Sequence, residues 1–279
     1  MKSPTETLLG FLVYGLCILA LEMQQIQISV VVITFNEERN IRRCLESVAQ
    51  IADEIVVVDS FSKDKTEEIC QQFPNLRFIT NRFSGHIEQK NFALDQAKFD
   101  FVLSLDADEA LSDSLKDQIL AVKMNAQFDA FQFNRLSNYC GTWIRHGSWY
   151  PDVKLRLFNR HKVRWQGINP HDKAELTVPG TVKHLKGDLL HYTYYTIDEH
   201  TRKLDYFSTL AAEAYFKKGK KAGFFQLLIN PSFAFFRDYI LRMGFLDGYS
   251  GWLIARLTAF YTLQKYAKLR FLYSQAKQN

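Results

Sequence analysis

The chain has 279 residues, of which 47% are hydrophobic and 23% are charged, as in ordinary globular proteins. Its formal net charge is +5, but the basic residues are unevenly spread, and a lysine cluster at residues 217–221 stands beside a strongly aromatic segment. This arrangement favours an anionic membrane surface as the partner and argues against nucleic acid. The cysteines form neither a C-x-x-C pair nor a zinc spacing, which indicates buried thiols in a reducing compartment; they are Cys17, Cys44, Cys70 and Cys140.

The first 22 residues contain an apolar run, residues 8–21, that is shorter than the roughly 20 residues of a membrane-spanning helix. Only Lys2 precedes the run and no small-residue cleavage pattern follows it, so it makes a poor secretory signal. Two interpretations remain, a weak membrane anchor or an upstream extension of a protein whose folded part begins near Met23. We favour the extension, because a predicted strand follows Met23 almost at once.

Between residues 26 and 108, short β-branched runs alternate with helical periods, the pattern of consecutive βα units around a parallel sheet. Ile28–Thr34 is apolar almost throughout, so we expect a central strand that is covered on both faces. A helix is predicted to follow over residues 36–49, with Asn36 as its N-cap. The other predicted elements here are strands at 54–58, 76–80 and 101–105 and helices at 65–73 and 88–97.

Beyond about Asp113 the alternation stops. A region of aromatic residues, glycines and mixed short strands runs over about residues 130–195, and we expect it to face the acceptor of a reaction. From about residue 205 the chain is predicted to be helical again. One helix is expected to begin with Asn230 as its cap and Pro231 in its first position, and another covers about residues 251–272.

Polar clusters follow three of the predicted strands: Asn36-Glu37-Glu38, Asp59-Ser60 and Asp106-Ala107-Asp108-Glu109. In an open α/β sheet, ligands bind beyond the carboxyl ends of the strands, so the three clusters can share one crevice. Two carboxylates two positions apart can present oxygens to a Mg²⁺ or Mn²⁺ ion that also holds a diphosphate. The alternative for the third cluster is a solvated turn, and for the first two it is helix capping rather than hydrogen bonding to a base or ribose.

Other phosphate-binding devices are missing from the sequence. It contains no G-x-x-x-x-G-K-[ST] loop and no G-x-G-x-x-G after the first predicted strand. These absences argue against a P-loop enzyme and against a dinucleotide-binding enzyme.

Four segments together resemble family 2 glycosyltransferases of the GT-A fold: VVITFNEERNI (31–41), VVVDSFSKDKT (56–66), QKNFAL (89–94) and LSLDADE (103–109). Further along, LRLFN (155–159), WQGINPHD (165–172) and GFLDGYSGW (244–252) are similar to the lipopolysaccharide core glucosyltransferases that add glucose to inner-core heptose. The resemblance implies an α/β fold, a GT-A (Rossmann-like) mostly parallel sheet with flanking helices, followed by C-terminal amphipathic helices. We expect a GT-A domain over residues 23–200, with a donor half at 26–112 and an acceptor half at 113–200, and a membrane-associating tail at 201–279.

The resemblance also assigns roles to residues. It implies that Thr34, Asn36, Glu37 and Asp59 hold the uridine, Lys90 and Asp106 the ribose or diphosphate, and Asp108 the divalent metal, with Asp172 as the catalytic base. Two positions depart from the family pattern: Lys65 stands where glycine is common, and Asp172 where glutamate usually follows the histidine. Glu175 is therefore a rival base, and a polar loop pair is the non-catalytic interpretation of residues 171–172.

The acceptor half holds further candidates with open interpretations. His191 is either a metal ligand or pyrophosphate donor, or a hydrogen-bonded histidine in an aromatic core. Trp143, Trp149 and Trp165 are candidates for stacking on sugar faces, although large aromatic residues more often belong to a core. Basic side chains that can meet phosphorylated sugars are Lys154, Arg156 and Arg164.

We therefore expect an inverting, metal-dependent enzyme that transfers a hexose, above all glucose from UDP-glucose, to a lipopolysaccharide core heptose. The tail is predicted to lie on the cytoplasmic side of the bacterial inner membrane as a peripheral element, because no stretch of 18 residues is free of charge. A pair of helices that covers the sheet is the alternative for the tail. The alternative functions are a polyprenyl-phosphate hexosyltransferase and a non-catalytic nucleotide-sugar-binding module.

Overall fold

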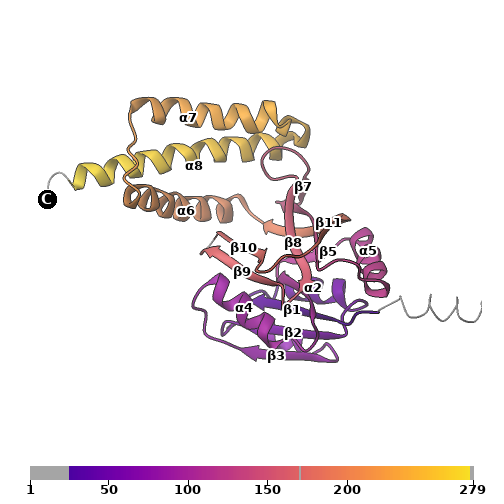
Figure 1. The fold of residues 1–279 in the computed structure, drawn as a ribbon. Coiled ribbons are helices and arrows are strands. Elements are labelled where there is room, and N and C mark those ends of the chain that lie inside the picture. The colour runs from indigo at the N-terminus through magenta and orange to yellow at the C-terminus, as the bar shows by residue number, and fades with distance from the viewer. Residues whose placement is uncertain (1–24, 170, 277–279) are drawn as a thin grey trace, which may run out of the picture. The chain divides into compact units, whose positions relative to one another are not determined.

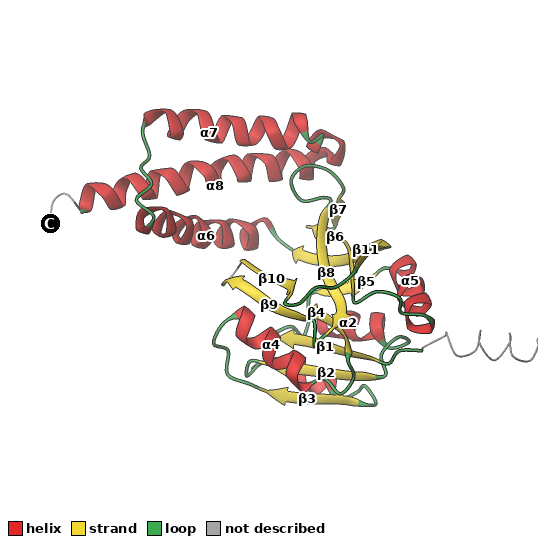
Figure 2. Ribbon diagram, viewed as in Figure 1, coloured by secondary structure: helices red, strands yellow, loops and turns green. Residues whose placement is uncertain are grey.

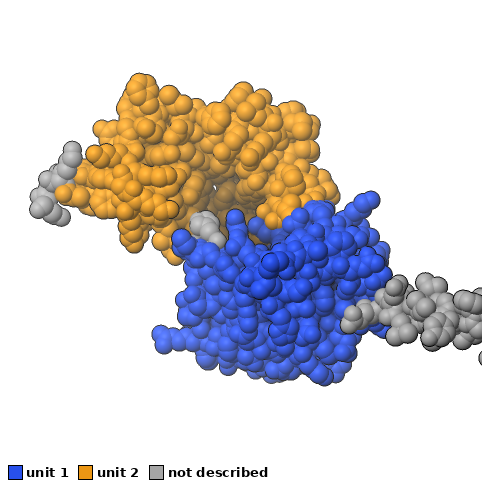
Figure 3. All heavy atoms as spheres, in the orientation of Figure 1, with its two compact units in different colours: residues 1–133, 154–189 blue, residues 134–153, 190–279 orange. Residues whose placement is uncertain are grey.

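The computed structural model describes residues 25–169 and 171–276 (Figure 1). The expected N-terminal extension and Cys17 lie outside this part of the chain. Among the residues described, no helix combines the length and the apolar character needed to cross a bilayer. The described residues form two compact units, one within residues 1–133 and 154–189 and one within residues 134–153 and 190–279, which Figure 3 colours separately.

The first unit contains the predicted parallel strands. They lie in the order β3-β2-β1-β4, and each neighbouring pair is parallel. Figure 2 shows these strands with helices beside them. The bounds are β1 Ile28–Thr34, α2 Ile41–Val48, β2 Glu54–Asp59, α3 Thr66–Cys70, β3 Leu76–Thr80, α4 His86–Gln96 and β4 Phe101–Asp106. The expected α/β class is confirmed, and each of the four strands agrees with its predicted bounds to within one residue.

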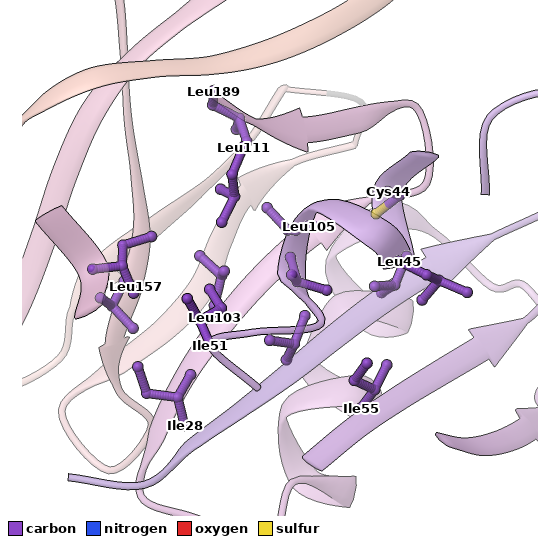
Figure 4. Packing of buried hydrophobic residues seen from close by; sticks show 14 of the residues in the cluster. Ile28, Cys44, Leu45, Ile51, Ile55, Leu103, Leu105, Leu111, Leu157 and Leu189 are labelled. Carbon is purple, nitrogen blue, oxygen red and sulfur yellow. The ribbon is translucent and has the colours of Figure 1, made fainter. Parts of the chain in front are cut away.

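The central position predicted for β1 is confirmed by its burial on both faces. Val30 and Val32 belong to a core cluster on one side of the sheet, whereas Val31 belongs to a separate cluster. Figure 4 shows side chains of the first cluster from different elements, such as Leu45 of α2 and Leu103 of β4. Each fully buried side chain of this kind contributes about 1.5–3 kcal/mol to folding, so the strand is anchored from both sides.

Beyond β4 the sheet changes character, because β8 pairs with β4 in the antiparallel direction. Among the described residues the sheet continues in the order β4-β8-β6-β11-β5, and a separate hairpin pairs β9 with β10. The strands β6, β8 and β11 run from the first unit into the second. The bounds are β5 Glu109–Leu111, α5 Asp113–Met124, β6 Ala130–Tyr139, β8 Asp152–Asn159, β9 Val163–Ile168, β10 His171–Leu176 and β11 Val182–Tyr194.

The prediction that Asn36 caps the first helix is wrong. Helix α2 begins at Ile41, and Asn36 has a backbone φ of +54° in the left-handed region, which asparagine tolerates better than most residues. Its side-chain oxygen accepts a hydrogen bond from the backbone N–H of Lys63, 2.8 Å away. Because this long-range bond satisfies the side chain, residues 35–40 form a loop rather than a first helical turn.

The second unit contains β7 (Thr142–Ile144), α6 (Ile197–Lys217), α7 (Phe224–Phe236) and α8 (Gly248–Gln275), and α8 packs against both α6 and α7. The helix predicted over residues 251–272 is confirmed as part of α8. The prediction that Asn230 and Pro231 begin a helix is wrong, because α7 begins at Phe224 and Pro231 lies inside it. Packing of α7 on α8 outweighs the single backbone hydrogen bond that the proline removes.

Candidate functional site

Three of the predicted site residues end neighbouring strands of the first unit. Thr34 lies opposite Asp59 in the β1–β2 register, and Ile33 lies opposite Asp106 in the β1–β4 register. The carboxyl ends of these parallel strands therefore bring Thr34, Asp59 and Asp106 to one edge of the sheet, the edge at which ligands bind in open α/β folds. The hydroxyl of Thr34 is buried and has no hydrogen-bond partner among the described residues.

The loops that follow β1 and β2 are joined to each other by hydrogen bonds. The backbone N–H of Asn36 donates to Ser62 Oγ at 2.7 Å, and the N–H of Glu37 donates to Thr66 Oγ1 at 2.9 Å. Asp59 is buried and accepts a hydrogen bond from the N–H of Ser62 at 2.7 Å. Through these contacts Asn36, Glu37 and Asp59 hold both loops in one arrangement beside the strand ends.

Two exposed aromatic side chains stand in these loops. Phe35 precedes Asn36, Phe61 lies between Ser60 and Ser62, and more than half of each side chain is exposed. Neither ring is among the site residues predicted from the sequence, although a phenylalanine beside a polar turn is a recognisable signal. Flat rings at this edge are suited to stacking on a nucleotide base.

Lys90 of α4 connects two predicted site residues. Its Nζ atom lies 2.8 Å from Asp172 Oδ2 and 3.1 Å from Asp106 Oδ1, and only 6% of its side chain is exposed. The ammonium group also lies 4.2 Å from the centre of the Trp165 ring. Because two carboxylates and an aromatic face surround the ammonium group, the charge of Lys90 is compensated despite its burial.

Asp172 reaches Lys90 from 82 residues away because the β9–β10 hairpin is attached to α4. Asn91 and Trp165 exchange two hydrogen bonds, from Asn91 Nδ2 to the carbonyl of Trp165 at 2.9 Å and from the N–H of Trp165 to Asn91 Oδ1 at 3.0 Å. At the other end of the hairpin, Asn169 Oδ1 accepts from the N–H of Ile87 in the first turn of α4 at 3.0 Å. The hairpin is therefore held at two points.

The pleat of β10 separates the two rival bases. Side chains alternate between the faces of a strand, so Asp172, Ala174 and Leu176 share one face, and Ala174 and Leu176 pack against the core. Glu175 lies on the opposite face and is exposed. Only Asp172 of this pair points toward Lys90.

A buried ionic cluster that the sequence analysis missed supports Asp106. Arg156 Nη2 of β8 lies 3.1 Å from Asp106 Oδ2 and 2.7 Å from Glu109 Oε1, and the exposed fractions of the Arg156 and Glu109 side chains are 3% and 0%. Burial by itself would lower the pKa of the Arg156 guanidinium, but the charges of Glu109 and Asp106 raise it above its usual value. The available signal was a lone arginine within the apolar segment LRLFN.

This cluster also shows where Arg156 and Trp165 lie, two residues whose roles the sequence left open. Arg156 lies against Asp106 and Glu109, and its guanidinium carbon lies 5.1 Å from the centre of the Trp165 ring. Trp165 is buried in contact with Lys90, so it belongs to the core of the first unit rather than to a sugar-stacking surface. Three buried nitrogens here have no hydrogen-bond partner among the described residues, namely Arg156 Nε, Arg156 Nη1 and Trp165 Nε1.

Asp108 lies between β4 and β5, two residues after Asp106, and is partly exposed. Within the described part of the chain, no group of three or more histidine, cysteine, aspartate or glutamate side chains can hold a metal ion. Mg²⁺ is commonly held by one or two carboxylates together with substrate phosphates and water, so a single carboxylate at this edge fits such an ion when a diphosphate supplies further ligands.

His191 belongs to the second unit. Its Nδ1 atom lies 2.9 Å from Thr193 Oγ1 and 3.4 Å from Ser137 Oγ, and both hydroxyl groups belong to the same unit. These contacts agree with a hydrogen-bonded histidine. A role of His191 in metal binding stays a prediction.

Comparison with known proteins agrees with this geometry. Residues 29–184, more than half of the chain, match the model of glycosyl transferase family 2. A protein of Rickettsia typhi described as an uncharacterized glycosyltransferase is 32% identical over 256 residues, which cover 88% of this chain and 87% of that protein. The lipopolysaccharide core biosynthesis glycosyltransferase LpsC of Rhizobium meliloti is 30% identical over 259 residues, 87% of this chain and 94% of LpsC.

Among solved structures, S. aureus TarS 1-349 in complex with UDP aligns with 90% of this chain and 92% of its own, with 17% sequence identity and a TM-score of 0.45. The family match spans the parallel strands, both joined loops, Lys90, the Asp106 cluster and the β9–β10 hairpin. The expected GT-A type of α/β fold and the expected enzyme class are confirmed, and the chain belongs to glycosyl transferase family 2.

Proposed function

We propose that this family 2 glycosyltransferase transfers a hexose from a UDP-sugar, above all UDP-glucose, to a heptose of a lipopolysaccharide core. The observation that carries the proposal is the ion-paired group Asp106–Lys90–Asp172 at the strand ends. It joins a carboxylate of the predicted donor site to the predicted base. The acceptor class is supported by the similarity to LpsC over 94% of its length.

The donor half supplies the binding groups. The uridine is assigned to Thr34, Asn36, Glu37 and Asp59, which line the joined loops and the β1–β2 strand ends. Lys90 and Asp106 are assigned to the ribose and diphosphate. Loops held by their own hydrogen bonds lose little conformational freedom when a ligand binds, which favours tight nucleotide binding.

In the proposed reaction, Asp172 accepts the proton of the acceptor hydroxyl. The hydroxyl oxygen forms a bond to the anomeric carbon while the bond from that carbon to the diphosphate oxygen breaks, and the electron pair leaves with UDP. Because attack and departure occur on opposite faces, the configuration inverts. The positive charge of Lys90 stabilises the negative charge that develops on the leaving diphosphate. A Mg²⁺ or Mn²⁺ ion held by Asp108 would supply further charge neutralisation when bound.

Asp108→Ala is expected to lower turnover at saturating Mn²⁺ by about 10²- to 10³-fold, because the carboxylate that holds the ion at the diphosphate is lost. Steady-state kinetics across a Mn²⁺ titration measures this effect. The matched control is Asp113→Ala, since Asp113 is highly exposed and pairs with Lys116 at the start of α5. Equal metal dependence in wild type and Asp108→Ala would refute the metal assignment.

The tail is assigned to the cytoplasmic surface of the bacterial inner membrane. Exposed apolar side chains follow the lysine cluster along α7, among them Phe224, Phe225, Leu228 and Ile229. Basic residues next to exposed apolar ones favour an anionic bilayer surface. The division into a GT-A domain over 23–200 and a membrane-associating tail over 201–279 stays our proposal for the functional parts.

Nucleotide release from a panel of nucleotide sugars tests the transferase proposal. Purified protein is incubated with each donor and with lipopolysaccharide core or polyprenyl phosphate as acceptor. We expect UDP release that requires a UDP-hexose and the core acceptor. UDP release that requires polyprenyl phosphate would identify the protein as a polyprenyl-phosphate hexosyltransferase instead. If no combination of donor and acceptor releases nucleotide, the protein is a non-catalytic nucleotide-sugar-binding module.

A further inference from the structure

Residues 237–248, which we call the corner, connect α7 to α8 in the second unit. They form the short helices η1 (Arg237–Leu241) and η2 (Gly244–Asp247). The corner is tightly packed, because a Cβ atom on Gly244 would overlap the carbonyl oxygen of Asp238, and one on Gly251 would overlap the carbonyl oxygen of Gly244. Close packing of the backbone therefore requires glycine at Gly244 and Gly251 of the GFLDGYSGW segment.

The corner binds a loop of its own unit, residues 145–148, through two aspartates. The Asp247 carboxylate accepts hydrogen bonds from the N–H groups of Arg145 and His146 at 3.1 and 2.8 Å, and it pairs with His146 Nδ1 at 2.9 Å. Asp238 is buried and accepts from Ser148 Oγ at 2.9 Å. Both acidic side chains are thus engaged by the loop.

The outward side of the corner is apolar and basic. Leu241, Met243, Phe245 and Leu246 are between 45% and 59% exposed, although large apolar side chains usually avoid water. Arg242, within this run, and Arg145, at the start of the attached loop, are also exposed. The carbonyl of Arg242 accepts a hydrogen bond from the N–H of Gly147 at 2.9 Å, so run and loop lie side by side.

We infer that the corner and its attached loop dock on an anionic phospholipid bilayer, with Arg145 and Arg242 at the lipid phosphates and the four apolar side chains below them. The lysine cluster lies before the other end of α7, so the basic groups flank the exposed apolar side chains of that helix at both ends. This inference deepens the membrane part of the proposed function and rests on it.

The charges on the corner favour a bilayer, rather than a second copy of the chain, as its binding partner. The acidic groups of the corner are engaged by residues 145–148, whereas its exposed charges are basic. Two such surfaces facing each other would place arginine against arginine, which is unfavourable. An anionic bilayer presents phosphates above an apolar layer, and this order matches basic residues beside apolar ones.

Vesicle binding of the full chain tests the inference. We compare wild type, Arg145→Gln/Arg242→Gln and the matched control Arg42→Gln/Lys98→Gln, whose basic side chains are exposed in the first unit. On vesicles with 30% phosphatidylglycerol, the corner variant should partition about 30-fold less than wild type, since it loses two charges near the lipid surface. The control should partition within about 2-fold of wild type. Phe245→Ser/Leu246→Ser should weaken binding to phosphatidylglycerol and to pure phosphatidylcholine vesicles alike.

Hydrogen exchange with and without vesicles locates the contact. Amides of residues 145–148 and 241–249 should exchange more slowly on phosphatidylglycerol vesicles. Unchanged partitioning of the corner variant, absence of this protection, or protection caused by dimerisation without vesicles would each overturn the inference. UDP binding, measured by calorimetry on the same variants, should equal that of wild type, so a failed membrane contact is distinguishable from a failed donor site.

Discussion

Replacing Asp172 by asparagine is expected to lower kcat by about 10²- to 10⁴-fold, the usual contribution of a positioned general base. Asparagine has nearly the shape of aspartate but cannot accept the hydroxyl proton. Lys90 keeps its second partner, Asp106, so the strand-end group should persist and the KM for the donor should change little. Steady-state kinetics with varied donor and acceptor measures both parameters.

Glu175→Gln is the matched control for Asp172→Asn. Both changes convert an acid to its amide on the same strand, but Glu175 lies on the exposed face of β10. We expect its kcat to stay within about 2-fold of wild type, as is usual for exposed substitutions remote from the chemistry. If Glu175→Gln loses the activity while Asp172→Asn retains it, the assignment of the base is reversed.

Arg156→Met is expected to lower the free energy of unfolding by about 3–5 kcal/mol, because it leaves Glu109 as a buried carboxylate without its guanidinium partner. Methionine is apolar and of comparable length, so lost volume explains little of this loss. Urea unfolding of wild type and variant measures it. Activity should also fall, since Asp106 loses one of the two cations beside it.

A double change separates charge pairing from packing. Glu109→Gln/Arg156→Met removes both charges of the pair, and we expect it to be more stable than Arg156→Met alone. Arg164→Met serves as the surface control, because the ion pair of Arg164 with Asp95 is largely exposed and should contribute at most about 1 kcal/mol. Equal stability of wild type and Arg156→Met would show that the buried pair contributes nothing.

The sequence predicted the parallel half of the fold well for a physical reason. A strand buried on both faces needs an uninterrupted apolar run, and Ile28–Thr34 and the runs at 54–58 and 101–105 have few other structural uses. Once these strands are parallel, their polar ends must meet at one edge. The proximity of Thr34, Asp59 and Asp106 could therefore be predicted without coordinates.

The rest of the site depends on contacts between residues far apart in the chain. Nothing local to residues 165–172 indicates that Asn91 holds the hairpin to α4, and so the pairing of Asp172 with Lys90 could not be derived from spacing. The burial of Arg156 with Glu109 was hidden for the same reason, since a basic residue in a strand more often faces solvent. At Asn36 and Pro231, long-range contacts outweighed local preference.

A crystal structure of the complex with UDP and Mn²⁺ shows whether the strand-end groups of the first unit form one donor site. We expect the uridine against the joined loops of Asn36 and Asp59, and the diphosphate beside Lys90 with the ion on Asp108. Bound nucleotide away from this edge, with the Asp106–Lys90–Asp172 group untouched, would contradict the account.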